Sequence, residues 1–197
     1  MCYDPPKTFA NFNIKGNKDL KLALIAAKRW AEGEYLHLIL VGPVGVGKTH
    51  LALAAAATMR ARGEEPRVYK VAEMVERLRA GYDNKTHDAV FSEFTWSDPL
   101  VMDDMGQQRR TKDREGGNRI SEFAIEQLEL IVDRRLSNKA PTMFTTNLPR
   151  EMLKVATSER LGSRVFSRID GVHEVVIEAE DYRPRVEERG ISDEAPH

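Results

Sequence analysis

The stretch GPVGVGKT, residues 42–49, decides how this chain is interpreted. It matches the phosphate-binding loop pattern G-x-x-x-x-G-K-[ST] at every fixed position. Leu36–Val41 before it is an apolar run of buried-strand length, and Leu51–Ala61 after it is rich in Ala and Leu, which favours a helix. A glycine-rich turn between a strand and a helix offers backbone N–H groups and a positive helix end to phosphate oxygens. The sequence therefore predicts a nucleoside triphosphate site.

Two side chains of this loop have specific expected tasks. Lys48 is expected to reach the β- and γ-phosphates, and the hydroxyl of Thr49 is expected to ligate Mg²⁺. The residues expected to contact the nucleotide are Gly42, Pro43, Val44, Gly45, Val46, Gly47, Lys48, Thr49 and His50.

The composition limits the other classes of function. A length of 197 residues fits one α/β domain with short extensions. With 30 Lys+Arg against 31 Asp+Glu, the net charge is −1, so any nucleic-acid contact must come from a local patch. The single cysteine, Cys2, excludes an internal disulfide, and the five histidines show no metal-ligand spacing. Neither a membrane helix nor a signal peptide is apparent, so we expect a cytoplasmic protein without membrane contact.

Strand and helix patterns alternate along the rest of the chain. Further strands are predicted over Arg67–Val71, Leu100–Met102, Pro141–Thr146 and His173–Ile177. Helices are predicted over Asn17–Trp30, Ala72–Ala80 (closed by Gly81), about Ile120–Leu136 and Leu161–Ile169, whereas Tyr82–Thr95 gives no clear assignment. This alternation predicts an α/β fold with a parallel five-stranded sheet flanked by helices.

The chain is expected to divide into three parts. Residues 1–35 would form an N-terminal segment with a leading helix, residues 36–178 the nucleotide-binding domain, and residues 179–197 a charged tail. The tail is too short for a full helical lid domain, so we expect the core alone.

An acidic pair follows the predicted third strand. In phosphate-loop enzymes, an aspartate at the end of a neighbouring apolar strand holds Mg²⁺, and Asp103 fits that task. Asp104 would then face the γ-phosphate and orient or deprotonate the attacking water. The alternative is a pair of solvated acids at the end of a strand.

Three further polar residues follow in chain order. Asn147, at the end of the fourth strand, could hydrogen-bond the catalytic water, although Asn is also ordinary turn chemistry. Arg164 and Arg168 lie four residues apart and would share one face of the predicted helix. A guanidinium aimed at a γ-phosphate raises the rate of phosphoryl transfer by roughly 10³–10⁵. Two solvated arginines on an amphipathic helix are the alternative.

Taken in order, these segments resemble the AAA+ ATPases, specifically the helicase loaders of the DnaC/DnaI type and their IstB-like relatives. The segments are GPVGVGKTHLA (42–52), LVMDDMG (100–106), TTN (145–147) and ERLGSRVFSRI (159–169). The resemblance covers roughly residues 8–185 and includes TFANF (8–12), DRRL (133–136) with Pro141, and DYR (181–183).

The resemblance implies an ATP–Mg²⁺ site that two subunits share. In this family Asp103 and Asp104 would be the Walker B pair, with Asp in place of the usual Glu, and Asn147 would be sensor 1. Arg168 would be the arginine finger inserted into a neighbouring subunit's site, with Arg164 beside it. Such a site requires self-association into a ring or an open spiral. Hydrolysis of ATP to ADP and phosphate would be slow and assembly-dependent, and it would accompany loading or remodelling of a replicative DNA helicase during DNA replication.

Loaders of this type also bind single-stranded DNA along the inside of a spiral, and two segments here are candidates. The first contains Arg79, Tyr82 and Lys85, an aromatic ring for base stacking beside two cations. The second is a basic stretch that contains Arg109 and Arg110. A solvated surface loop is the alternative interpretation of the second segment.

Three other functions stay open. An IstB-like transposition helper would use the same ATP chemistry on a different client. A small-molecule kinase would need an acceptor pocket and a lid, and the sequence offers no segment for either. A binding module with negligible turnover is the third, because the side chain of Asp104 is shorter than that of Glu and lies farther from the water. Loaders usually carry an N-terminal helicase-binding domain, and few residues precede the resemblance here, so the ATPase domain would contact the helicase or the client would differ.

Overall fold

The computed structural model describes residues 6–96, 98–106, 110–112, 118–120 and 122–180. A parallel five-stranded sheet runs in the order β2-β3-β6-β1-β7, which confirms the predicted α/β class. Its strands are β1 (His37–Val41), β2 (Arg67–Lys70), β3 (Leu100–Met105), β6 (Thr142–Thr146) and β7 (Val172–Val176). A separate antiparallel pair is formed by β4 (Arg110–Lys112) and β5 (Asn118–Ile120).

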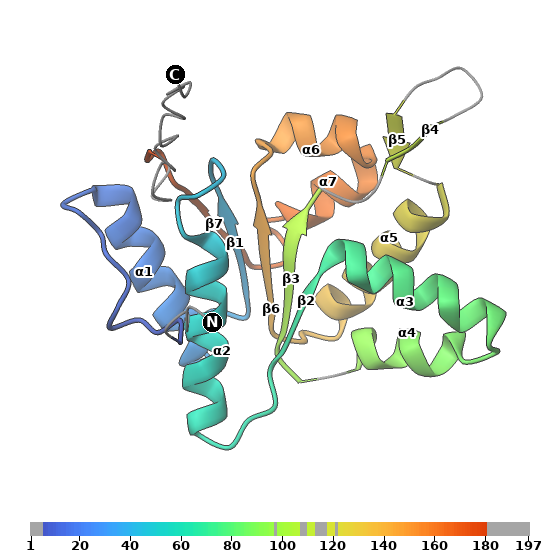
Figure 1. Cartoon of the computed structure of the whole chain (residues 1–197), viewed down its shortest axis with the longest axis horizontal. Coiled ribbons are helices and arrows are strands. Elements are labelled where there is room, and N and C mark those ends of the chain that lie inside the picture. The colour runs from blue at the N-terminus through green and yellow to red at the C-terminus, as the bar shows by residue number, and fades with distance from the viewer. Residues whose placement is uncertain (1–5, 97, 107–109, 113–117, 121, 181–197) are drawn as a thin grey trace, which may run out of the picture.

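Helices cover both faces of the sheet (Figure 1). One face carries α1 (Lys18–Ala31) and α2 (Lys48–Ala61). The other carries α3 (Val71–Asp83), α4 (His87–Thr95), α5 (Glu122–Ser137), α6 (Arg150–Ala156) and α7 (Glu159–Val165). Within the described ranges, the helices are too short or too polar to cross a membrane.

The alternation of side chains along β1 explains why both faces are covered. Leu38 and Leu40 belong to the core under α1 and α2, whereas Ile39 and Val41 belong to the core under the other helices. All four side chains are buried, which is the pattern of a parallel strand in the middle of a sheet.

The strand order brings the phosphate loop, the acidic pair and the segment of Asn147 to the same edge of the sheet. β1 lies between β6 and β7, and β3 lies on the other side of β6. Because these strands are parallel, the segments that follow Val41, Met105 and Thr146 meet at one edge of the sheet.

The predicted end of one helix at Gly81 is wrong. α3 continues through Gly81 to Asp83, and α4 then begins at His87, in the segment without a predicted assignment. A Cβ on Gly81 would lie 3.0 Å from the Cα of His87. Glycine therefore serves here to let the two helices approach closely rather than to end the first one.

The predicted helix Leu161–Ile169 is too long. α7 ends at Val165, and Arg168 lies in a turn rather than on the helical face of Arg164. The hydroxyl of Ser167 accepts a hydrogen bond from the N–H of Asp170 (3.2 Å), and this side-chain bond favours the turn over a further helical turn. The short elements α6, β4 and β5 were also not predicted.

A buried arginine fixes the amino edge of the sheet. Arg135, at the end of α5, donates to the hydroxyl of Thr142 (2.9 Å) and to the carbonyl oxygens of Phe94 (3.0 Å) and Pro141 (2.8 Å). Burial lowers the pKa of Arg135 to about 10. These bonds satisfy a cation that would be costly to bury alone, and they join α5 to β6.

His37, on β1, is fully buried, and neither ring nitrogen has a hydrogen-bond partner among the described residues. Burial and the positive charge of Arg135 lower the pKa of His37 to about 4, while Asp170 opposes this effect. The folded protein therefore holds this imidazole neutral at a pH where the unfolded chain protonates it.

The stability of the fold should fall as the pH drops from about 6.5 to about 4, because only the unfolded state binds a proton to His37 in that range. The loss from this group should approach about 3 kcal/mol in the free energy of unfolding. Urea unfolding at pH 7 and pH 5 should show a smaller pH effect in His37→Leu than in the wild type. The exposed His173→Gln variant should keep the wild-type effect, and an equal pH dependence in His37→Leu would contradict this assignment.

Candidate nucleotide-binding and hydrolysis site

The phosphate loop joins β1 to the N-terminus of α2, as the sequence predicts. Gly47 precedes the first helical residue with a φ of +94°, a conformation that favours glycine. A Cβ at this position would lie 2.6 Å from the Cε2 of Phe12. Gly47 is thus required by its backbone conformation and by the ring packed against it.

An N-terminal segment is packed against this end of α2. The Nε2 of His50 is hydrogen-bonded to the carbonyl oxygen of Thr8 (2.9 Å), and its ring contacts that of Phe12 edge-on at 5.3 Å between centroids. Thr8 and Asn11 close a turn by bonding each other's backbone N–H groups. His50, predicted as a nucleotide contact, therefore also anchors the segment that supports the loop.

Lys48 is held inside the loop. Its Nζ donates to the carbonyl oxygens of Gly42 and Pro43, both at 2.7 Å, and the residue is only 6% exposed. Burial lowers the pKa of Lys48, and the carboxylates of Asp104 and Asp103 oppose this effect. An ammonium group fixed in a glycine-rich loop is well placed to pair with a phosphate.

The carboxylate of Asp103 joins three elements. The hydroxyl of Thr49, on α2, lies 3.1 and 3.0 Å from its two oxygens, and the hydroxyl of Thr145, on β6, donates to it at 2.6 Å. Asp103 is 2% exposed, and this burial raises its pKa, while the hydrogen bonds from Thr145 and Thr49 lower it.

The pair of Thr49 and Asp103 fits a magnesium site. Both supply oxygen atoms, the ligands that Mg²⁺ prefers, and their side chains already face each other. Within the part of the chain that the structure describes, no group of three or more His, Cys, Asp or Glu side chains could hold a metal ion by itself. Mg²⁺ in nucleotide sites is commonly held by one or two protein groups together with phosphates.

Asp104 stands in an irregular part of β3. Its φ is +58°, and the pairing with β6 shifts register between Met102 and Met105. The N–H of Asp104 leaves the strand ladder and donates to the hydroxyl of Thr145 (3.0 Å). This bulge re-aims a half-buried carboxylate at the end of the strand.

Thr145 is a site residue that the sequence analysis did not identify. Its hydroxyl donates to Asp103 and accepts from the backbone of Asp104, so it orients both acids. It is fully buried on β6. The only indication in the sequence was that Thr145 lies in the TTN segment, of which only Asn147 was predicted as a site residue.

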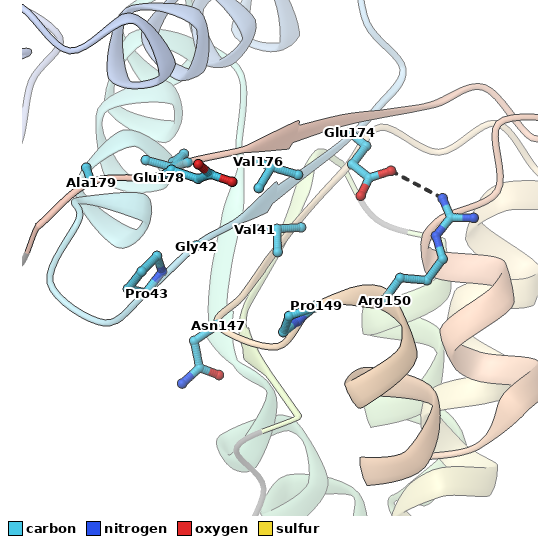
Figure 2. Close-up of a pocket in the computed structure, with 11 residues that line it drawn as sticks. Val41, Gly42, Pro43, Asn147, Pro149, Arg150, Glu174, Val176, Glu178 and Ala179 are labelled. Atoms are coloured by element: carbon cyan, nitrogen blue, oxygen red, sulfur yellow. Dashed lines mark hydrogen bonds and ion pairs between the residues drawn. The ribbon is translucent and has the colours of Figure 1, made fainter.

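Asn147 follows β6 beside the start of the phosphate loop, and the N–H of Gly42 donates to the carbonyl oxygen of Thr146 (3.2 Å). Asn147 lines a cavity of about 600 Å³ next to Gly42 and Pro43 (Figure 2). An ion pair between Arg150 and Glu174 (3.2 Å) also lines it. The other lining residues are Val41, Pro149, Val176, Ile177, Glu178 and Ala179.

The two candidate arginines lie elsewhere. Arg164, on α7, is paired with Asp133 (2.7 Å) and Asp170 (2.9 Å). Arg168 is exposed in the turn that leads into the amino end of β7. The structure therefore does not bring either arginine to the phosphate loop of the same chain.

The first candidate DNA segment forms an aromatic hollow at the end of α3. Tyr82 is 54% exposed, and its ring packs edge-on against Phe123 of α5 at 5.4 Å. The guanidinium of Arg79 lies 5.8 Å from the centre of the Phe123 ring. A cavity of about 590 Å³ is lined by Arg79, Tyr82, Asp83 and Phe123.

The other candidate DNA residues are less defined. Lys85 is exposed in the turn between α3 and α4. Arg109 lies outside the described residues, and Arg110 is described only as the first residue of β4, without its side chain.

The loop, the acidic pair and the strand order together define a phosphate-loop fold of the AAA+ type. The crystal structure of the DnaC helicase loader matches with a TM-score of 0.69 and 22% identity, over 86% of this chain and 98% of that one. DnaA from Aquifex aeolicus, bound to AMPPCP, matches with a TM-score of 0.71 and 20% identity, over 89% of this chain and 51% of that one. At this level of identity, the matches show the fold alone.

The chain belongs to the family of IstB-like ATP-binding proteins, whose model matches residues 3–190. A Mycobacterium tuberculosis protein named for ATP binding and for an insertion sequence is 28% identical over 188 residues, covering 93% of this chain and 70% of the relative. The replicative helicase loader DnaC of Escherichia coli K12 is 28% identical over 184 residues, covering 91% of this chain and 70% of that relative.

Replacing Thr145 by Val should weaken the Mg²⁺-dependent part of ATP binding by roughly 10–100-fold, the usual effect of removing a partner of a metal ligand. Affinity measured with EDTA should change little, because Thr145 does not contact the loop. Titration calorimetry with and without Mg²⁺ would test this. Thr145→Ser keeps the hydroxyl and should bind as the wild type does, and an unaltered Mg²⁺ effect in Thr145→Val would refute the assigned role.

Replacing Lys48 by Ala should weaken ATP binding by roughly 100-fold, since a charge-assisted bond to phosphate contributes about 1.5–3 kcal/mol. Equilibrium binding of a fluorescent ATP analogue would measure it. Replacement of the exposed Lys85 by Ala is the matched control. Normal nucleotide affinity in Lys48→Ala would contradict the assignment of residues 42–49 as the phosphate-binding loop.

Proposed function

We propose that this protein binds ATP with Mg²⁺ and hydrolyses it to ADP and phosphate in a head-to-tail assembly of identical chains. The support is the buried lysine in the phosphate loop and the carboxylate of Asp103, which contacts Thr49. Residues 36–178 form the ATPase domain of this proposal, between the segments 1–35 and 179–197.

Each polar residue has a role in the proposed hydrolysis. The loop N–H groups and Lys48 bind the phosphates, and Thr49 and Asp103 hold Mg²⁺, which neutralises charge on the phosphate oxygens. Asp104 accepts the proton of the attacking water, and the bond to the leaving ADP breaks as the new bond to phosphorus forms. Asn147 orients the water from the end of β6.

The position of Arg168 is the observation that best supports the proposed assembly of chains. β1 and β7 are adjacent and parallel, with His37 opposite Val172 and Val41 opposite Val176. The phosphate loop follows the carboxyl end of β1, whereas Arg168 precedes the amino end of β7. The strand length between them is about 15 Å at roughly 3.3 Å per residue, farther than an arginine side chain reaches. This separation supports the proposal that Arg168 serves the site of a neighbouring chain.

Arg168→Ala should bind ATP normally and lose hydrolysis by roughly 10³-fold or more. Mixed with Lys48→Ala, which keeps Arg168 but binds ATP poorly, it should regain part of the activity, because each chain supplies what the other lacks. Phosphate release in the mixture and in each variant alone would measure this. No recovery in mixtures that still assemble would argue against a shared site.

The aromatic hollow on α3 supports a second part of the proposal, contact with single-stranded DNA. Tyr82 and Phe123 present aromatic surface for a base, and Arg79 and Lys85 supply cations for phosphates. Arg109 and Arg110 would extend this basic path.

Tyr82→Ala should weaken binding to a single-stranded oligonucleotide by roughly 5–150-fold, since stacking on one ring contributes about 1–3 kcal/mol per base. Tyr82→Phe keeps the ring and should bind normally. Fluorescence anisotropy would measure DNA affinity, with melting temperature as the check on folding. Unchanged affinity in Tyr82→Ala would exclude the hollow from the DNA path.

The proposed client is a replicative DNA helicase, on which the assembly acts during DNA replication in the cytoplasm. The relative named as a replicative helicase loader supports this choice. A second candidate is a transposition helper, favoured by the IstB-like family model and by the relative from an insertion sequence. Affinity purification from the native host with ATP present, and identification of the retained protein as a helicase or a transposase, would decide between them.

A further inference from the structure

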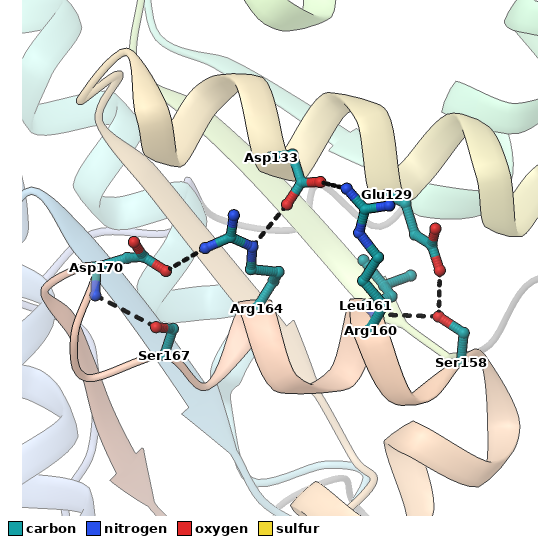
Figure 3. A network of polar contacts seen from close by, with 8 residues as sticks. All are labelled: Glu129, Asp133, Ser158, Arg160, Leu161, Arg164, Ser167 and Asp170. Atoms are coloured by element: carbon teal, nitrogen blue, oxygen red, sulfur yellow. Dashed lines mark hydrogen bonds and ion pairs between the residues drawn. The ribbon is translucent and has the colours of Figure 1, made fainter.

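The turn that contains Ser167 and Asp170 is tied to α5 through a network of charged residues (Figure 3). Asp133, on α5, accepts hydrogen bonds from Arg160 and from Arg164 of α7, the latter at 2.7 Å between Nε and Oδ1. The Nη1 of Arg164 donates at the same time to Asp170 (2.9 Å). Arg164 thus bridges a carboxylate of α5 and a carboxylate of the turn.

The turn itself is closed by two backbone hydrogen bonds between residues close in sequence. The N–H of Val172 donates to the carbonyl oxygen of Ser167 (3.0 Å), and the N–H of Gly171 donates to that of Arg168 (3.1 Å). The contact of Asp170 with Arg164 then fixes this closed turn against α7 and α5. Arg168 therefore lies in the chain between Arg164 and Asp170, which are bonded to each other.

Arg164 and Arg168 differ in the ion pairs that they form. Arg164 makes charge-assisted bonds to two carboxylates, and their side chains are only 16% and 26% exposed. Its Nε and Nη1 are engaged in this way, so a phosphate contact through either nitrogen would compete with a bond worth about twice a neutral one. Arg168, by contrast, is exposed and takes part in no ion pair with any residue that the structure describes.

We infer that Arg164 is a positioning residue: it holds the turn of Arg168 in place, through Asp133 and Asp170, and does not itself touch the neighbouring nucleotide. This inference rests on the proposed assembly-dependent hydrolysis. A preformed turn saves the cost of ordering the Arg168 loop when two chains meet. It also explains why an acid on α5 accompanies the arginine-bearing segment in this chain.

The test is a double-mutant cycle on kcat with Arg164→Gln and Asp170→Ala. Each single change should lower kcat by roughly 10–100-fold with ATP affinity unchanged, and the double variant should be no slower than the slower single one, because both break the same tether. Mixing Arg164→Gln with Lys48→Ala should restore turnover, which would locate the defect on the side that donates Arg168.

Arg160→Gln is the matched control, since Arg160 shares Asp133 but makes no bond to the turn; its kcat should stay within about twofold of the wild type. The inference is overturned if Asp170→Ala leaves kcat unchanged or raises it while Arg164→Gln abolishes turnover, since Arg164 would then act on phosphate directly. Wild-type kcat in Arg164→Gln, or multiplicative losses in the double variant, would overturn it as well. Full activity in Arg168→Ala would instead refute the proposed function. Because that variant differs from the variants that test Arg164, the two failures can be told apart.

Discussion

The proposed chemistry depends on one buried carboxylate. Asp103 accepts hydrogen bonds from Thr49 at the start of α2 and from Thr145 on β6, while its own backbone belongs to β3. A buried carboxylate is costly unless it is paired, so these bonds hold three elements in a fixed relation. The phosphate loop, the acidic pair and the end of β6 are consequently joined at one edge of the sheet.

The same parallel sheet sets a limit on what a single chain can do. Its carboxyl edge carries the loop and the acids, and its amino edge carries the turn of Arg168. No side-chain movement brings these two ends together, because the strands between them are part of the packed core. A catalytic contribution from that arginine therefore requires a second chain, and the tether through Arg164 gives the turn a defined shape for that contact.

The fold class and the nucleotide loop could be predicted because they rest on local patterns: an apolar run, a glycine-rich turn and an alternation of strands and helices. The roles of Thr145 and Phe123 could not, since each depends on contacts between elements that are distant in sequence. The end of α7 at Val165 was missed for a different, local reason. Apolar spacing continues to Ile169, but that side chain is 98% exposed, and the turn is closed by Ser167.

The most direct test of a site shared between chains is the ATPase rate per chain as a function of protein concentration, with sedimentation to record assembly. If the site is shared, activity per chain should fall toward zero on dilution and rise to a plateau as assemblies form. A constant rate per chain at concentrations where only single chains sediment would contradict it.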